Sequence, residues 1–375
     1  MVPQPSVKEL RGVFAPGARR RSYVWGVSLV MMLALVSAGS FAGILLAPWF
    51  SAKLLLSVVL GLGISLMFVI GHDACHDSLT PSHVLNQALG RVCFWPTLHP
   101  YVCWELGHNR LHHGWTNLKG VDYVYPPFSV GEFQKLPAWR RGLERIYRTV
   151  PGIGLFYFIE IWWKHMIVPR REDFTKLSRG TFALDLVLVL AFFAAELFLT
   201  IRYAPSTEHA LMNVLCALVI PYAIWNWLMA FVTIQHHTHP KAPWFKNIED
   251  WTFFHGQVHG TIHVRLPRWI ELLFHNILDH TAHHVDPKIP LYHLPACQKR
   301  LEESFSGDVV VEHSSIPALA RVLRVCKLYD YERHCWLDFE GRPSAPPVAL
   351  QRWARAEANG TENSRSQRAS EIQAA

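Results

Sequence analysis

Four long apolar runs, grouped in two pairs, dominate the pattern of hydrophobic and polar positions. They cover residues 24–46, 54–70, 182–201 and 211–234. A helix needs about 20 apolar residues to cross the ~30 Å hydrocarbon core of a bilayer, and each run approaches that length. Only short links, at residues 47–53 and 202–210, separate the members of each pair. The pattern therefore predicts two membrane hairpins that contain four transmembrane helices.

The remaining segments are polar and predict three regions. Residues 1–22 form a basic N-terminus, and residues 23–344 form the main domain. Within this domain, residues 71–180 carry too many Lys and Arg side chains to cross a bilayer. The last segment, residues 345–375, is rich in Ser, Asn, Arg and Gln and is predicted to be a disordered tail.

The distribution of basic residues predicts the orientation of the hairpins. Both short links carry few Lys or Arg residues, so the positive-inside rule places the links outside and the remaining polar segments in the cytoplasm. The first run is too long for a secretory signal peptide, and Pro48 follows it. We expect a multi-pass protein of the bacterial inner membrane, surrounded by membrane lipids, with both termini in the cytoplasm.

Two further segments have the composition of the headgroup layer. Residues 84–104 and 152–168 combine Trp side chains with Lys, Arg or Pro. Amphipathic aromatic rings near basic side chains are typical of the interface between water and hydrocarbon. We therefore expect both segments to lie along the membrane surface.

Composition supports a membrane protein and argues against a nucleic-acid partner. The chain is 50% hydrophobic and only 17% charged, below the roughly 25% charged residues usual in soluble domains. The net charge of +7 is spread between apolar runs without a nucleic-acid-binding motif. The seven cysteines form no Cys-x-x-Cys pair, which indicates reduced thiols and no disulfides.

Histidine is the unusual residue type in this sequence. The chain has 22 histidines, and 11 of them fall into four clusters. The clusters are His72 and His76; His108, His112 and His113; His236, His237 and His239; and His280, His283 and His284. In three clusters the spacing of three or four residues would place imidazoles on one side of a helix.

The predicted orientation brings all four clusters to the cytoplasmic face. Eight or nine imidazoles are more than one tetrahedral zinc ion can use, so two metals are implied. Imidazole binds zinc, copper, nickel or iron, so the ligand type leaves the metal open. Nearby carboxylates could hold the second ring nitrogens; the candidates are Asp73, Asp77, Asp122, Asp250 and Asp279.

The clusters and the motifs between them resemble a known family. His72-Asp-Ala-Cys-His76, His108-Asn-Arg-Leu-His112-His113 and His280-Thr-Ala-His283-His284 are similar to the three histidine boxes of the membrane fatty acid desaturase superfamily. The stretches His237-Thr-His-Pro, Asp250-Trp and Phe274-His-Asn-Ile resemble its Δ12/ω-3 acyl-lipid branch and bacterial relatives. The resemblance covers about residues 50–300.

This resemblance implies a centre of two non-haem irons with O₂ as co-substrate. The implied ligands, through which catalysis would occur, are His72, His76, His108, His112, His113, His237, His280, His283 and His284. His236 stands where the family usually has glutamine, and it is a possible further ligand. The implied fold is all-α, with four transmembrane helices in two hairpins and a cytoplasmic helical cap that holds the di-iron site.

Other histidines resemble the clusters in spacing alone. His255, His259 and His263 are also four residues apart, but the family has no matching ligands there. We expect these three to lie at an interface or beside the metal ligands. The role of His239 stays open.

The implied reaction is O₂-dependent desaturation of an unactivated acyl chain that is free or linked to a lipid, CoA or a carrier protein. An alternative in the same superfamily is oxidative decarboxylation of a fatty acid to a 1-alkene, or hydroxylation or acetylenation. A non-catalytic membrane metal-binding or transport protein is poorly supported, since charges within the runs are limited to Asp185, Glu196 and Arg202.

The reaction needs electrons and a channel for the acyl chain. The sequence has no haem-binding His-Pro-Gly-Gly motif, dinucleotide fingerprint or iron–sulfur cysteine spacing, so a separate donor such as a ferredoxin, rubredoxin or cytochrome is implied. A basic cytoplasmic surface would favour an acidic donor. Trp225, Trp227, Phe231 and residues of the second run are candidates to line the acyl tunnel, although lipid contact or core packing would also account for them.

Overall fold

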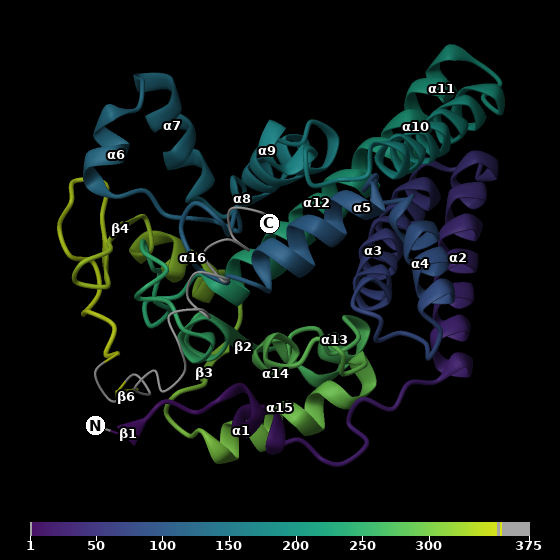
Figure 1. Cartoon of the computed structure of the whole chain (residues 1–375). Helices are drawn as coiled ribbons and strands as arrows, with labels where there is room; N and C mark the ends of the chain where they lie inside the picture. The colour runs from purple at the N-terminus through teal and green to yellow at the C-terminus, as the bar shows by residue number, and fades with distance from the viewer. Residues whose placement is uncertain (1, 351–352, 355–375) are drawn as a thin grey trace.

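Four apolar helices run through the right and centre of Figure 1. The structure, a computed structural model, describes residues 2–350 and 353–354. The helices that are long and apolar enough to span a membrane are α2 (Tyr23–Leu46), α3 (Phe50–Cys75), α10 (Arg179–Arg202) and the continuous segment Thr207–His237. That last segment consists of α11 (Thr207–Val214), the π-helix η3 (Leu215–Val219) and α12 (Ile220–His237). The predicted spans are confirmed.

Local sequence signals explain where these helices begin and end. The hydroxyl of Ser22 accepts a hydrogen bond from the backbone N–H of Trp25, and Ser178 and Ser206 cap α10 and α11 in the same way. Such caps satisfy backbone donors that have no partner inside the helix. Helix α2 ends at the Ala47-Pro48 link, because proline disfavours helical backbone in the residue before it.

Buried polar contacts join the two hairpins. The ammonium group of Lys53 donates to the side-chain oxygen of Asn213 at 2.7 Å, which links α3 to α11. At a second position, Arg91 on α4 (His83–Phe94) lies 2.8 Å from the carboxylate of Asp185 on α10. Asp185 also accepts a hydrogen bond from the backbone N–H of Val102 at 2.9 Å. The charged residues within the spans thus have a structural role.

A set of short helices, the cap, packs around the long helices and their histidine-bearing ends. In chain order they are α1 (Val7–Gly12), α4, α5 (Tyr101–Trp104), η1 (Glu105–His112), α6 (Val130–Lys135), α7 (Ala138–Tyr147), α8 (Ile153–Phe156), η2 (Tyr157–Ile167), α9 (Arg171–Phe174), η4 (His255–His259), α13 (Arg268–Leu273), α14 (His280–Val285), η5 (Leu291–His293), α15 (Leu294–Ser304) and α16 (Ile316–Val325). Three of these, η1, η2 and η4, are π-helices. The predicted headgroup segments contain α5, α8, η2 and nearly all of α4.

Short strands make the fold mostly helical instead of all-α. The parallel pairs are β1 (Val2–Pro3) with β6 (Trp353–Ala354) and β2 (Ile262–Arg265) with β3 (Val310–His313); the antiparallel pair is β4 (Leu328–Asp330) with β5 (Cys335–Leu337). These strands are not apparent in the sequence, because β1–β6 and β2–β3 join segments far apart in the chain. The seven cysteines are free, as predicted.

The two ends of the chain both contact the cap. Arg11 donates to the backbone carbonyl of Val285 at 2.9 Å, and Arg19 lies 2.6 Å from the carboxylate of Asp286, so the basic N-terminus packs against α14. At the other end, the backbone N–H of Val348 donates to the carbonyl of His334 at 2.9 Å. Of the tail predicted to be disordered, residues 351–352 and 355–375 lie outside the described residues.

Candidate metal centre

Helix α3 carries the first histidine cluster out of the predicted membrane region. The helix continues past its apolar run to Cys75, so His72 lies in its last turn and His76 is its C-cap residue. Gly71 allows this end of α3 to approach α4 closely, because a Cβ atom at Gly71 would lie 2.6 Å from the ring of Phe94. Close packing therefore sets the position of His72 and His76.

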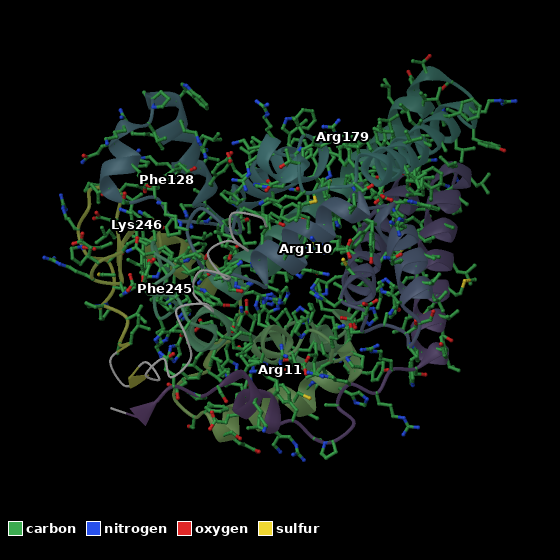
Figure 2. All side chains as sticks on the ribbon, viewed as in Figure 1. Arg11, Arg110, Phe128, Arg179, Phe245 and Lys246 are labelled. Carbon is green, nitrogen blue, oxygen red and sulfur yellow. The ribbon has the colours of Figure 1, made fainter. Side chains whose placement is uncertain are left out.

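The second cluster lies on the π-helix η1. The backbone N–H of His113 donates to the carbonyl of His108 at 2.9 Å, an i→i+5 hydrogen bond. Such π-segments are rare and occur frequently at functional sites. The wider turn aligns His108 with His113 instead of with His112. Arg110, labelled in Figure 2, belongs to the same helix and is exposed, whereas His108 and His112 are buried.

The remaining clusters lie on α12 and α14. His236 and His237 form the last turn of α12, which ends where Thr238 adopts extended backbone. Helix α14 carries His280, His283 and His284, and it is positioned by a hydrogen bond of 2.8 Å from the backbone N–H of Ala282 to the side-chain oxygen of Gln298. These histidines are all buried.

The structure brings the nine histidines into two groups. Within each group, one ring nitrogen of every residue lies within 4.8 Å of those of the others. Group A contains His72, His76, His108, His113 and His283. Group B contains His112, His237, His280 and His284.

Neighbouring histidines are divided between the groups. His112 belongs to group B and His113 to group A, while His283 belongs to group A and His284 to group B. By contrast, His72 and His76, four residues apart at the end of α3, belong to the same group. Adjacent residues on a helix point in different directions, so the pairs His112-His113 and His283-His284 each contribute one side chain to each group.

The separations between ring nitrogens fit metal binding. Two nitrogens that bind one ion at about 2.1 Å and at right angles to each other are separated by about 3.0 Å. Four Nε2–Nε2 separations lie at 3.0–3.1 Å: His112–His237, His237–His280, His108–His113 and His113–His283. The Nε2 atoms of His76 and His284 are buried without a hydrogen-bond partner in the described chain. Nitrogens placed in this way fit two metal ions.

Six grouped histidines outside the spans are held in the neutral form that binds metals. Burial lowers their pKa well below the usual value, and neighbouring imidazoles lower the pKa further. This holds for His76, His108, His113, His280, His283 and His284. A neutral imidazole keeps one ring nitrogen free to act as a ligand.

Other side chains and the backbone hold the second ring nitrogens of three group B histidines. The carboxylate of Asp122 accepts from Nδ1 of His112 at 3.0 Å. The side-chain oxygen of Gln257 accepts from Nδ1 of His284 at 2.8 Å, and the backbone carbonyl of Gly260 lies 3.3 Å from Nδ1 of His237. These contacts set the tautomer and direct Nε2 of each ring toward the centre of the group.

Of the five candidate carboxylates, Asp122 makes the close contact with a clustered histidine. Asp73 lies 3.9 Å from Nδ1 of His72. Asp77 contacts His83, Asp279 contacts His263 and Asp250 accepts from Asn247. For these last three, the structure places the carboxylate beside a different partner.

Sequence reasoning missed Gln257, Thr116 and Trp104. Gln257 lies on η4 between His255 and His259, where the regular histidine spacing concealed it. Its side chain is fully buried and also donates to the carbonyl of His113 at 2.8 Å, so it contacts both a group A and a group B residue. The hydroxyl of Thr116 lies 3.0 Å from the Gln257 oxygen, and Trp104 stacks on His108 with ring centroids 4.6 Å apart.

The other histidines lie outside the two groups. His236 stacks on His280 with ring centroids 3.6 Å apart, and its Nε2 is buried without a hydrogen-bond partner in the described chain. His239 lies 3.5 Å from the carboxylate of Glu312. His259 lies 3.3 Å from Asp308 and 3.0 Å from His255, while His263 contacts Asp279 and Glu302.

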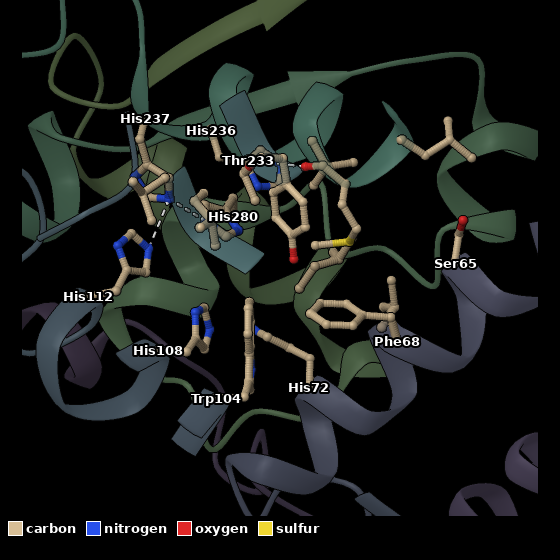
Figure 3. Close-up of a pocket in the computed structure, with 18 of the residues that line it drawn as sticks. Ser65, Phe68, His72, Trp104, His108, His112, Thr233, His236, His237 and His280 are labelled. Atoms are coloured by element: carbon tan, nitrogen blue, oxygen red, sulfur yellow. Dashed lines mark hydrogen bonds between the residues drawn. The ribbon is translucent and has the colours of Figure 1, made fainter. Parts of the chain in front are cut away.

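An apolar pocket extends from the histidines into the helices (Figure 3). His72, His108, His112, His237 and His280 line one end. Figure 3 shows Phe68 and Ser65 of α3 on the side away from His112 and His237. The α12 residues that line the pocket are Leu228, Met229, Val232, Thr233, His236 and His237.

The tunnel prediction is only partly right. Second-span residues line this pocket, as expected, but Trp225, Trp227 and Phe231 do not. Trp227 stacks on Phe231 with ring centroids 5.2 Å apart and donates to the carbonyl of Val150 at 2.9 Å.

Comparison with known proteins identifies the family. The fatty acid desaturase family model matches residues 48–315, which is more than two thirds of the chain. The chain belongs to the fatty acid desaturase family. The match covers all four histidine clusters and the three long helices from α3 to α12, so the family features coincide with the two histidine groups.

Several desaturases from photosynthetic organisms are similar to this chain. A chloroplastic omega-6 fatty acid desaturase of Glycine max is 31% identical over 76% of this chain and 65% of its own length. The corresponding Spinacia oleracea desaturase is 29% identical over 84% of this chain and 67% of its own length. An sn-1 oleoyl-lipid 12-desaturase of Synechocystis is 28% identical, over 84% and 86% of the two chains. The chain thus spans about two thirds of the length of the plant relatives.

Proposed function

We propose that this protein is an O₂-dependent desaturase that introduces a double bond into the acyl chain of a membrane lipid. The observation that carries the proposal is the apolar pocket that ends at both histidine groups. A pocket of this kind presents an unreactive hydrocarbon to a metal centre and offers little to a polar substrate. The names of the relatives support a lipid-linked acyl chain, and desaturation at the Δ12 or ω-6 position.

Groups A and B would each hold one iron, and the donor sets fit this assignment. Imidazole is a suitable ligand for iron, and the family is one of di-iron enzymes. Once bound, the irons supply the oxidising chemistry with O₂ that removes hydrogen from an unactivated CH₂ group. The nine grouped histidines are the proposed ligands, and His236 is proposed to shape the pocket beside His280.

The protein itself positions the acyl chain and excludes water. Phe68, Val69 and Met229 offer an apolar wall that replaces contact with water, which favours binding of a hydrocarbon. Trp104 lines the pocket while it stacks on His108, so it fixes the orientation of one proposed ligand and the position of the chain. In a neutral imidazole one ring nitrogen carries no proton, and this nitrogen would bind the metal.

The electrons are proposed to come from a separate protein. Formation of one double bond removes two hydrogens from the chain, and reduction of O₂ to two molecules of water takes up these hydrogens together with two electrons and two protons from outside. A ferredoxin, rubredoxin or cytochrome would supply them. We further propose that the histidine groups and both termini lie on the cytoplasmic side of a bacterial inner membrane.

Product analysis tests the reaction. The purified protein is supplied with iron, O₂, an electron donor and a glycerolipid that carries labelled oleoyl chains, and the products are identified by mass spectrometry. We expect a product of unchanged carbon number with two hydrogens fewer. An alkene one carbon shorter, formed from a free fatty acid, would instead establish the decarboxylase alternative.

A substitution in group B tests the metal assignment. In His112→Ala we expect loss of activity and less bound iron, with membrane insertion unchanged, because one ligand and its hydrogen bond to Asp122 are removed. His255→Ala is the matched control, since His255 is also buried but belongs to neither group; we expect at most a partial loss. Full activity and full iron content in His112→Ala would refute the assignment.

The structure does not favour a transport protein. The carboxylate of Glu196 accepts a hydrogen bond from the hydroxyl of Tyr222 at 2.8 Å, and Asp185 pairs with Arg91. Acidic groups that form an ion path are directed toward a polar cavity. Here both acids have partners on neighbouring helices, which is typical of a structural role.

A further inference from the structure

Two apolar hollows follow one another along α12. The apolar pocket ends, on this helix, at Leu228, about 13 Å from His237 at the helical rise of 1.5 Å per residue. A second hollow begins immediately beyond and is lined on α12 by Tyr222, Trp225 and Asn226. Both hollows have mainly apolar walls, but they are separate.

Trp225 lines the second hollow and packs against residues that line the apolar pocket. Trp225 lies on the same face of α12 as Met229 and Val232, four and seven residues further along, which both line the apolar pocket. It is 4% exposed. Its ring centroid lies 6.5 Å from that of Phe68 and 5.9 Å from that of Tyr157, and both of these residues line the apolar pocket as well.

Hydrogen bonds fix two side chains that pack against Trp225, those of Tyr157 and His99. Nε2 of the His99 ring accepts from the hydroxyl of Tyr157 at 3.2 Å, and Nδ1 donates to the carbonyl of Thr97 at 2.7 Å. His99 also packs against Trp225, with ring centroids 5.4 Å apart. The indole N–H of Trp225 itself has no hydrogen-bond acceptor among the described residues. Trp225 is therefore held by packing alone and can be replaced without breaking a hydrogen bond.

The chemistry of an acyl chain decides which end lies near Trp225. The end that carries the lipid headgroup is polar, and its burial in an apolar site without partners would cost several kcal/mol. The methyl end has no polar group. We therefore expect the methyl end to lie deepest, beside Phe68 and Tyr157 and the Trp225 ring that packs against them, when the chain reaches from the histidines into the pocket.

We propose that Trp225 limits how many carbons fit between the reacting position and the methyl end of the acyl chain. The proposal rests on the proposed function as a desaturase. Removal of the indole would join the apolar pocket to the second hollow. The far rim of that hollow includes Phe158 and Val219, which are 47% and 54% exposed, so a longer chain would have room to extend.

Chain-length preference tests this proposal. Wild-type protein and Trp225→Ala are given lipids whose acyl chains have the same reacting position and an increasing number of carbons beyond it. Because one methylene more or less in an apolar pocket changes kcat/KM by roughly ten-fold or more, we expect the preferred length to increase and the long-to-short product ratio to rise at least ten-fold. Phe193→Ala, which enlarges only the second hollow, should keep the wild-type profile.

Two further variants keep the test decisive. Trp225→Leu enlarges the pocket with less disturbance, and Met229→Trp, on the same face of α12, should shift the preference to shorter chains. An active Trp225 variant with the wild-type profile would overturn the proposal. If both Trp225 variants fail to fold, an unchanged profile in Met229→Trp overturns it. Absence of desaturation in the wild-type protein would instead count against the proposed function.

Discussion

Gln257 is a buried amide that connects the two histidine groups. It accepts from His284 and Thr116 and donates to the carbonyl of His113. A single uncharged side chain thus fixes the tautomer of a proposed ligand in one group and the backbone of a proposed ligand in the other. This position illustrates that residues which bind no metal can determine where the binding nitrogens lie.

Gln257→Leu should therefore lower metal affinity about 10- to 100-fold, the usual effect of removing such a supporting contact. The carbonyl of His113 would lose its side-chain donor, and Nδ1 of His284 would keep only the Thr116 hydroxyl, 3.2 Å away. Gln257→Glu keeps an acceptor for His284 but loses the donor to His113, so we expect an intermediate loss. Metal titration followed by elemental analysis measures both variants. Equal, wild-type affinity in Gln257→Leu would show that this amide does not support the site.

At the scale of the element, the close contact between α3 and α4 positions the first histidine cluster. Gly71 directly precedes His72 and faces the ring of Phe94 and the side chain of Cys93. The absence of a Cβ atom lets the two helices approach. A small residue on a helix thereby controls where the imidazoles of the next turn lie.

Gly71→Ala should displace the end of α3 and reduce iron content and activity, because the added Cβ would lie 2.6 Å from Phe94. Overpacking of this kind costs about 1–3 kcal/mol. Gly39→Ala on α2 is the matched control, since no atom lies within 4 Å of a Cβ added there. Thermal unfolding in detergent and iron content are measured for both. Identical results for the two variants would refute the positioning role of Gly71.

For the whole molecule, the orientation of the four long helices decides which side of the membrane the substrate and the electron donor approach. Figure 1 shows the link between α2 and α3 and that between α10 and α11 at the end of the helices away from α14 and the remainder of the cap. The proposed cytoplasmic location of the histidine groups thus requires both links to lie outside.

Cysteine labelling of intact cells tests this orientation. All seven native cysteines are buried, so they give a low background. Trp49 and Tyr203, in the two links, are 71% and 58% exposed. We expect Trp49→Cys and Tyr203→Cys to react with a membrane-impermeant maleimide, and Arg110→Cys to react only after permeabilisation. The opposite pattern would reverse the proposed orientation.

The sequence by itself determined the four long helices and the histidines that gather at their inner ends. Apolar runs of membrane length and three- or four-residue spacing are local properties, so they can be recognised without knowledge of the fold. Family resemblance added the metal and the class of substrate.

Only the tertiary structure decided how the histidines are shared between two groups, and which side chains support them. The π-helical turn of η1 pairs His108 with His113, and packing brings Gln257 against His284 across 27 residues of chain. The position of Trp225 beside Phe68 and Tyr157, which line the apolar pocket, also depends on packing between α12, α3 and η2. These features arise from contacts between distant segments, which a local pattern of residue types does not encode.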